Sequence, residues 1–171
     1  MANALGAPAR ADTHVGMMVD AGMPSGISGA LALQASASLR LHVGVGHNML
    51  GPGVRGGALL RLWRGTVAPT ISAEAGWYGR TDAAWLTEAV DATDGDAALE
   101  QVGYTYGAAH AGVEIAGKDA TFYAEMGAAR IHGDLYFRET SQTGDVTMAI
   151  ATESSLRFWT LSGRAGVLVW F

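Results

Sequence analysis

Cysteine is absent from this chain of 171 residues, and lysine occurs only once, at Lys118, whereas arginine occurs ten times. The absence of cysteine excludes a disulfide-stabilised scaffold and a thiolate metal site. Charged residues make up only 16% of the chain, which is too few to cover the surface of a water-soluble domain. The net charge of −5 offers no basic surface for nucleic acid, so no such partner is expected.

Long hydrophobic runs with a helical pattern are also missing. The longest uncharged stretch, residues 21–39, has the length of a membrane-spanning helix. It contains Pro24, three glycines and four serines, and its apolar residues alternate with small or polar ones. This pattern excludes a transmembrane helix and indicates strands.

The sequence is instead rich in glycine, with 24 residues or about twice the ordinary share, and in segments with an apolar side chain at every second position. Most of these segments are long enough to cross a hydrocarbon core as tilted strands. Residues 146–152 either extend the last hairpin or form a strand of their own. The eight predicted strands are 14–22, 27–34, 38–47, 54–63, 66–78, 102–116, 120–132 and 158–171.

The connections between these strands differ in length at the two ends of the predicted sheet. The short ones are 35–37, 64–65 and 117–119. The long ones, 79–101 and 133–155, fall together at the other end, as in outer-membrane barrels with short inner turns and longer external loops. We therefore predict an all-β, antiparallel up-and-down transmembrane barrel of eight strands. It forms a single domain over residues 13–171, after an N-terminal extension at 1–12 that is a signal remnant or a tag.

One face of the predicted strands is apolar and the other carries charges of both signs. Val113 and Glu114, for example, are adjacent and are expected to face opposite ways. Apart from two histidines, the charged face holds four carboxylates and four guanidinium groups. Balanced charge suits a narrow lumen in which each buried ion needs a partner, and eight strands leave just enough room for side chains to fill. The predicted lumen charge network is Asp20, Arg40, His42, Arg55, Arg61, Glu74, His110, Glu114, Glu125 and Arg164.

Aromatic residues gather near both ends of the predicted strands rather than along their length. Two bands of this kind are typical of side chains at the two interfaces of a bilayer. A soluble ligand-binding barrel is expected to line its interior with aromatic side chains instead. The predicted interface aromatics are Trp63, Trp77, Tyr104, Phe122, Phe158, Trp170 and Phe171.

The alternating final strand, the unequal connections and the charged lumen resemble the small eight-stranded outer-membrane barrels of Gram-negative bacteria, the OmpA/OmpX-like class. The resemblance is architectural and covers nearly the whole chain from His14 on. In that class the barrel-assembly machinery reads a C-terminal aromatic residue on an alternating strand, and Val167, Val169 and Phe171 match this pattern. The resemblance implies an outer-membrane location, contact with membrane lipid and lipopolysaccharide, and the assembly machinery as a partner.

No motif in the sequence specifies an activity. We expect a monomeric, structural or surface-interacting barrel with a packed lumen, without catalysis, cofactor or metal. One alternative is a narrow passive channel, and another is a soluble lipocalin-like carrier with its faces exchanged. A third alternative is a rim enzyme acting on lipid A, which requires a serine or acid beside a histidine. Ser25, His47 and His132 are the candidates for such a site.

Overall fold

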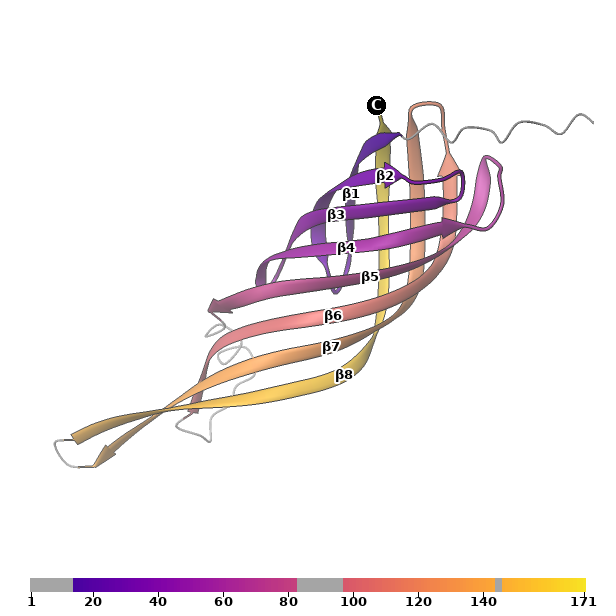
Figure 1. The fold of residues 1–171 in the computed structure, drawn as a ribbon. Coiled ribbons are helices and arrows are strands. Elements are labelled where there is room, and N and C mark those ends of the chain that lie inside the picture. Colours follow the sequence, from indigo (N-terminus) through magenta and orange to yellow (C-terminus); the bar gives the residue numbers. More distant parts are fainter. Residues whose placement is uncertain (1–13, 83–96, 144–145) are drawn as a thin grey trace, which may run out of the picture.

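In the computed structural model the chain forms a closed barrel of eight antiparallel strands, each paired with its neighbours in sequence, with β8 closing on β1 (Figure 1). The structure describes residues 14–82, 97–143 and 146–171, so the predicted N-terminal extension lies outside the described residues. This confirms the all-β, up-and-down fold of eight strands. Among the described residues no helix is long and apolar enough to cross a membrane. The strands are β1 Val15–Met23, β2 Gly26–Gln34, β3 Leu39–Asn48, β4 Gly51–Arg61, β5 Val67–Asp82, β6 Ala97–Ala116, β7 Ala120–Thr143 and β8 Val146–Trp170.

The alternation in the sequence becomes an inner and an outer face because successive side chains of a strand point to opposite sides. In β1, buried and exposed residues alternate from Val15 to Ala21. Val113 and Glu114 behave as predicted, with exposed fractions of 39% and 1%. A one-residue slip in pairing would therefore bring charges outside and apolar side chains inside.

The register of the strands gives the barrel its tilt. One row of outward-facing cross-strand partners, which we call the Trp77 row, starts at Arg157 on β8 and returns to β8 at Val167, ten residues further along. A shear of ten residues over eight strands corresponds to a strand tilt of about 40°. The Trp77 row consists of Arg157, His132, Thr105, Trp77, Val54, Val45, Gly29, Val19 and Val167.

The two ends of the barrel carry different connections. At one end, here called the turn end, β2–β3, β4–β5 and β6–β7 are joined, and the C-terminus lies there too (Figure 1). The opposite end, here called the mouth, carries the short β1–β2 connection at Pro24 and Ser25 and the β3–β4 connection at 49–50.

The predicted long loop at 133–155 is wrong, because β7 and β8 continue through it as paired strands that extend from the mouth, here called the β7–β8 ribbon (Figure 1). β6 pairs with β7 along the first part of this ribbon, as far as Glu139. The pairing of β7 with β8 runs from Asp134 with Ser155 to Thr143 with Val146. Pairing with β8, and with β6 as far as Glu139, gives the backbone of β7 hydrogen-bond partners outside the closed barrel. Residues 146–152 thus extend the last hairpin, which was one of the two predicted possibilities. The acidic connection between β5 and β6, residues 83–96, lies outside the described residues.

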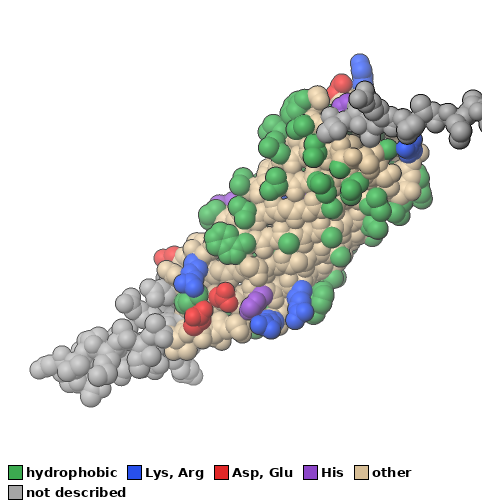
Figure 2. Space-filling view, in the orientation of Figure 1, with side chains coloured by type: hydrophobic (Ala, Val, Ile, Leu, Met, Phe, Trp, Pro, Cys, Tyr) green, Lys and Arg blue, Asp and Glu red, His purple; other side chains and the backbone are tan. Residues whose placement is uncertain are grey.

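The outer wall between the two ends is apolar. Valine, leucine, isoleucine and methionine side chains of β1 to β6 are exposed there, including Met17, Leu31 and Val43. Figure 2 shows hydrophobic side chains along the visible wall and most of the charged ones toward its ends. Of the described charged residues that face outward, Arg64, Lys118 and Asp119 lie at the turn end. Outward-facing charged residues on strands near or beyond the mouth include Arg80, Asp82, Arg130, Asp134, Glu153 and Arg157.

Candidate functional site inside the barrel

Five charged side chains in the interior form one chain of alternating sign. Nη2 of Arg55 on β4 donates to Oδ2 of Asp20 on β1 at 2.5 Å, and its Nη1 donates to Oε2 of Glu74 on β5 at 2.8 Å. Nη1 of Arg164 on β8 donates to the same Glu74 oxygen, and Nε of Arg164 donates to Glu125 on β7 at 2.8 Å. Since β5 and β8 are not paired strands, Glu74 and Arg164 connect distant walls of the barrel.

Histidine and hydroxyl side chains surround these carboxylates. Nε2 of His42 lies 3.1 Å from Oε2 of Glu74. His110 contacts Ser162 through Nε2 at 2.7 Å and Ser72 through Nδ1 at 3.3 Å. Glu74 has two guanidinium partners, and Asp20 and Glu125 have one each, so every buried carboxylate of the chain has a cationic partner. The hydroxyl groups that donate to Asp20, Glu74 and Glu125 come from Ser28, Thr70, Ser72, Tyr106 and Tyr123.

A second, smaller charge group lies nearer the turn end. Oε2 of Glu114 is 2.7 Å from Nη1 of Arg40, and Oε1 of Glu114 is 3.1 Å from Nε of Arg61. The guanidinium group of Arg40 also lies 5.1 Å from the ring centroid of Trp170, a cation–π contact. Two arginines and one carboxylate here, with three carboxylates and two arginines in the central chain, give the balance of four against four predicted from the sequence.

Tyrosines close the interior at the mouth. The hydroxyl of Tyr78 donates to the carbonyl oxygen of Ser25 at 2.5 Å, and that of Tyr104 donates to the carbonyl of Pro24 at 2.8 Å. Nδ2 of Asn48 donates to the same Pro24 carbonyl at 3.0 Å. The rings of Tyr78 and Tyr104 stack with centroids 4.9 Å apart. The β1–β2 connection is therefore held against side chains from β3, β5 and β6, and Ser25 is buried.

Glycines on neighbouring strands make room for these rings. Gly53 is the cross-strand partner of Tyr78, and a Cβ at Gly53 would lie 2.5 Å from Cδ1 of the ring. Gly76 is likewise the partner of Tyr106, with a Cβ position 2.3 Å from Cε1. A larger residue at either position would displace the ring that covers it.

The structure places all ten residues of the predicted lumen network inside the barrel, joined in the two groups above. The predicted interface aromatics differ in exposure. Trp63, Trp77, Phe122 and Phe171 are exposed. Tyr104 is only 6% exposed and belongs to the interior cluster, and Trp170 packs against buried Met18 and Leu168 and contacts Arg40. Phe158 is 42% exposed, although it is in phase with buried Ser162 on β8. The expected outward positions of Tyr104 and Trp170 are corrected, because nearness to a strand end does not determine the face.

Sequence reasoning missed the interior tyrosines Tyr78, Tyr106 and Tyr123. Their alternation phase identifies them, since Tyr78 lies four residues after Glu74 and Tyr123 lies two residues before Glu125. Such spacings place side chains on the same face of a strand. Placing aromatic residues at the bilayer interfaces by type overlooks this phase, since a buried Tyr is favourable wherever its hydroxyl finds an acceptor.

The residues considered for catalysis are not brought together. Ser25 is buried in the mouth connection, whereas His47 and His132 lie on β3 and β7 at outward positions. Within the described ranges no hydrogen bond joins Ser25 to either histidine. Nor do the described residues contain a group of three His, Asp or Glu side chains arranged to hold a metal ion.

Comparisons of the chain with protein-family models, with curated proteins and with solved structures found no match. The structure itself therefore carries the assignment: an eight-stranded antiparallel barrel with a buried, salt-bridged interior.

Proposed function

We propose that this protein is an integral outer-membrane barrel, a monomer with a closed lumen that serves a structural or surface-interacting role without catalysis. The observation that carries the proposal is the inverted distribution of polarity. Eight charged side chains are compensated inside the barrel, while large hydrophobic side chains are exposed on its outer wall. This arrangement is unfavourable in water and favourable in a bilayer.

The dimensions of the wall fit a hydrocarbon core. β1 to β4 contain 9 to 11 residues each, which at a tilt of about 40° rise by roughly 23–28 Å. Outer-membrane barrels have an apolar band of about 25 Å. Exposed Trp63, Phe122 and Phe171 lie at the turn end, and Trp77 and Trp159 lie toward the mouth. Aromatic side chains at both borders of an apolar wall favour a membrane orientation.

The interior contacts favour a closed lumen over a channel. The central ion-pair chain crosses the barrel from Asp20 to Glu125, and the Tyr78–Tyr104 stack lies beneath the connection at Pro24 and Ser25. An ion would have to break several charge-assisted hydrogen bonds to pass. The β7–β8 ribbon that extends from the mouth is the element best placed to contact other molecules at the cell surface (Figure 1).

Fractionation and solubility test the membrane assignment. The chain is produced behind a secretion signal in a Gram-negative host, and the envelope is separated into inner- and outer-membrane fractions. We expect the protein in the outer-membrane fraction, folded and monodisperse only in detergent. A monodisperse protein in plain buffer would contradict the proposal and favour the soluble carrier.

Two further readouts separate the remaining alternatives. We expect no unitary conductance after reconstitution in planar bilayers, and regular single-channel openings would favour the passive channel. We also expect unchanged lipid A in cells that overproduce the protein. A new lipid A species in those cells, absent from cells carrying the empty vector, would favour an enzyme at the rim.

A further inference from the structure

A basic hollow lies on the outer wall near the mouth. Arg130, His132 and Arg157 line it together with Thr105 and Gly107, and its volume is about 330 Å³. His132 pairs with both Thr105 and Arg157 across the strands, and Arg130 pairs with Gly107. A Cβ at Gly107 would meet no atom within 4 Å, so the hollow is open above this glycine.

The two arginines of this hollow differ from the arginines of the interior. Each interior arginine contacts a carboxylate. Arg130 and Arg157, in contrast, make no ion pair or side-chain hydrogen bond with the residues that the structure describes. Both lie on the outer face in diagonal positions on adjacent strands, so one anionic group can reach both guanidinium groups.

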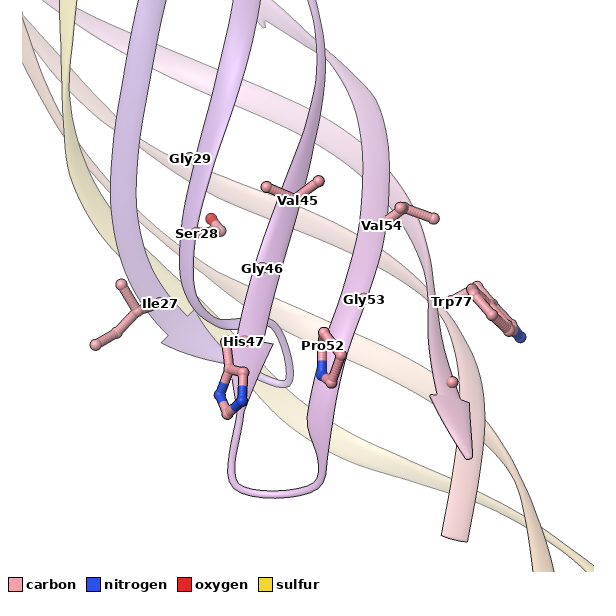
Figure 3. Close-up of a pocket in the computed structure, with 11 residues that line it drawn as sticks. Ile27, Ser28, Gly29, Val45, Gly46, His47, Pro52, Gly53, Val54 and Trp77 are labelled. Atoms are coloured by element: carbon pink, nitrogen blue, oxygen red, sulfur yellow. The ribbon is translucent and has the colours of Figure 1, made fainter. Parts of the chain in front are cut away.

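An apolar hollow of about 590 Å³ lies further along the same wall, over β2 to β5 (Figure 3). Ile27, Val45, Val54 and Trp77 line it, and the absence of a side chain at Gly29 leaves its floor open. These side chains are exposed on the outer wall. The hollow therefore offers a hydrocarbon chain an apolar, recessed surface.

The Trp77 row joins the two hollows. Starting from Arg157 and His132, it passes through Thr105 to Trp77 and continues to Val54. The row ends on β8 ten residues nearer the turn end than it began. Each residue of the row therefore lies further from the mouth along the barrel axis than the residue before it. A molecule held by its anionic end in the basic hollow can thus extend into the apolar hollow below.

From this arrangement we propose a binding site for a phosphorylated membrane lipid on the outer wall. Arg130 and Arg157 bind the phosphate, with His132 beside them, and an acyl chain follows the wall past Trp77 into the hollow over Gly29. Guanidinium groups suit phosphate oxygens because their planar donors form paired hydrogen bonds. The inference rests on the proposed membrane location, since the acyl chain must be surrounded by lipid. It adds to that proposal the class of ligand that binds the outer wall.

Titration of the folded protein in detergent micelles tests the site with three probes. These are dioctanoyl phosphatidic acid, dioctanoyl phosphatidylcholine with the same chains but no net charge, and inorganic phosphate. Binding is measured from the indole N–H resonance of Trp77, assigned by its loss in Trp77→Phe. We expect saturable binding of phosphatidic acid about tenfold tighter than of phosphatidylcholine, and no saturation by inorganic phosphate over the same range.

Two pairs of variants locate the phosphate and the chain. Arg130→Ala combined with Arg157→Ala should weaken phosphatidic acid binding about tenfold or more, whereas Arg64→Ala, an exposed arginine at the turn end, should leave it unchanged. Gly29→Ile fills the apolar hollow and should weaken binding of both lipids. Ala73→Ile, on the outer face of β5 outside the hollow, should not weaken either.

Equal binding of the two lipids by the unaltered protein would overturn the lipid site, and so would full binding by the double arginine variant. Inorganic phosphate that binds as tightly as phosphatidic acid would also overturn it, because the chain would then contribute nothing. These measurements use protein already folded in detergent. If the protein fractionates with the outer membrane but does not bind phosphatidic acid as expected, only the lipid site is contradicted. If the protein is soluble in plain buffer, the membrane assignment itself is contradicted.

Discussion

At the scale of the residue, Glu74 is the centre of the interior. Its carboxylate accepts hydrogen bonds from Arg55, Arg164 and Tyr106 and contacts His42 at 3.1 Å. It is the one carboxylate between the two arginines of the central chain, and these arginines have Asp20 and Glu125 as their outer partners. Removing one partner of a buried ion pair lowers the free energy of unfolding by more than the intact pair contributes to it, because the remaining charge is left uncompensated.

We therefore expect Glu74→Ala to lower the free energy of unfolding by about 3–5 kcal/mol. Urea titration of the protein folded in lipid vesicles, followed by tryptophan fluorescence, measures this change. Glu153→Ala is the matched control, since that carboxylate accepts a hydrogen bond from Tyr136 on the exposed ribbon. Its effect should be small, because exposed polar pairs contribute little. Equal effects of the two substitutions would show that the central chain does not stabilise the fold.

At the scale of the element, each strand presents its two faces to different surroundings. β3 places Arg40 and His42 inside and Val43 and Val45 outside. If the outer face meets lipid, the cost of a charge there depends on its depth, because the hydrocarbon core is driest at its midplane. In water the same charge would cost almost nothing at any position.

Val43→Arg and Val67→Arg test this dependence on depth. Val43 lies near the middle of β3, and Val67 lies at the turn end of β5, both outward and exposed. We expect a loss of about 2–4 kcal/mol in the free energy of unfolding for Val43→Arg and about 0–1 kcal/mol for Val67→Arg, measured in lipid vesicles. If Val43→Arg is as harmless as Val67→Arg, the outer wall does not face a hydrocarbon core.

The β7–β8 ribbon shows why one element was missed from the sequence. Inside the barrel, β7 alternates from Thr121 to Ala129 because one face is buried. Beyond the mouth, β7 pairs with β6 as far as Glu139 and with β8 as far as Thr143, and these pairings do not close into a barrel. A sheet that encloses no interior is under no selection for alternation, so hydrophobic periodicity cannot reveal such an extension.

At the scale of the whole molecule, the barrel depends on the closure of β8 on β1. Eight registered pairs join them, from Gly16 with Trp170 to Met23 with Gly163. This pairing removes both free edges, which would otherwise be templates for aggregation. The terminal Phe171 adds a backbone hydrogen bond to the carbonyl of Val15 at 3.0 Å, while its side chain is 72% exposed. The side chain therefore contributes little to closure and is free to contact another protein.

The substitution Phe171→Ala distinguishes a role of this side chain in the stability of the fold from a role in assembly of the barrel in cells. We expect it to refold in detergent with an unfolding free energy within about 1 kcal/mol of the unaltered protein, because the backbone bond to Val15 is kept. In cells, we expect the outer-membrane yield to fall several-fold if the barrel-assembly machinery is a partner that reads this aromatic residue. Quantified outer-membrane fractions give the result, with Phe171→Tyr as the conservative control. Equal yields of all three proteins would argue against this partner.

The sequence by itself determined the strand count, the up-and-down order and which charged residues share the inner face. These follow from an alternation of period two, which is a local property of extended backbone. Only the tertiary structure decided that Arg164 meets Glu74, that Tyr78 and Tyr104 close the mouth, and that Arg130 and Arg157 share one hollow on the outer wall. Those contacts depend on a shear of ten residues around the closed barrel. The shear is the total of the register offsets between neighbouring strands, so the sequence of one strand alone does not reveal it.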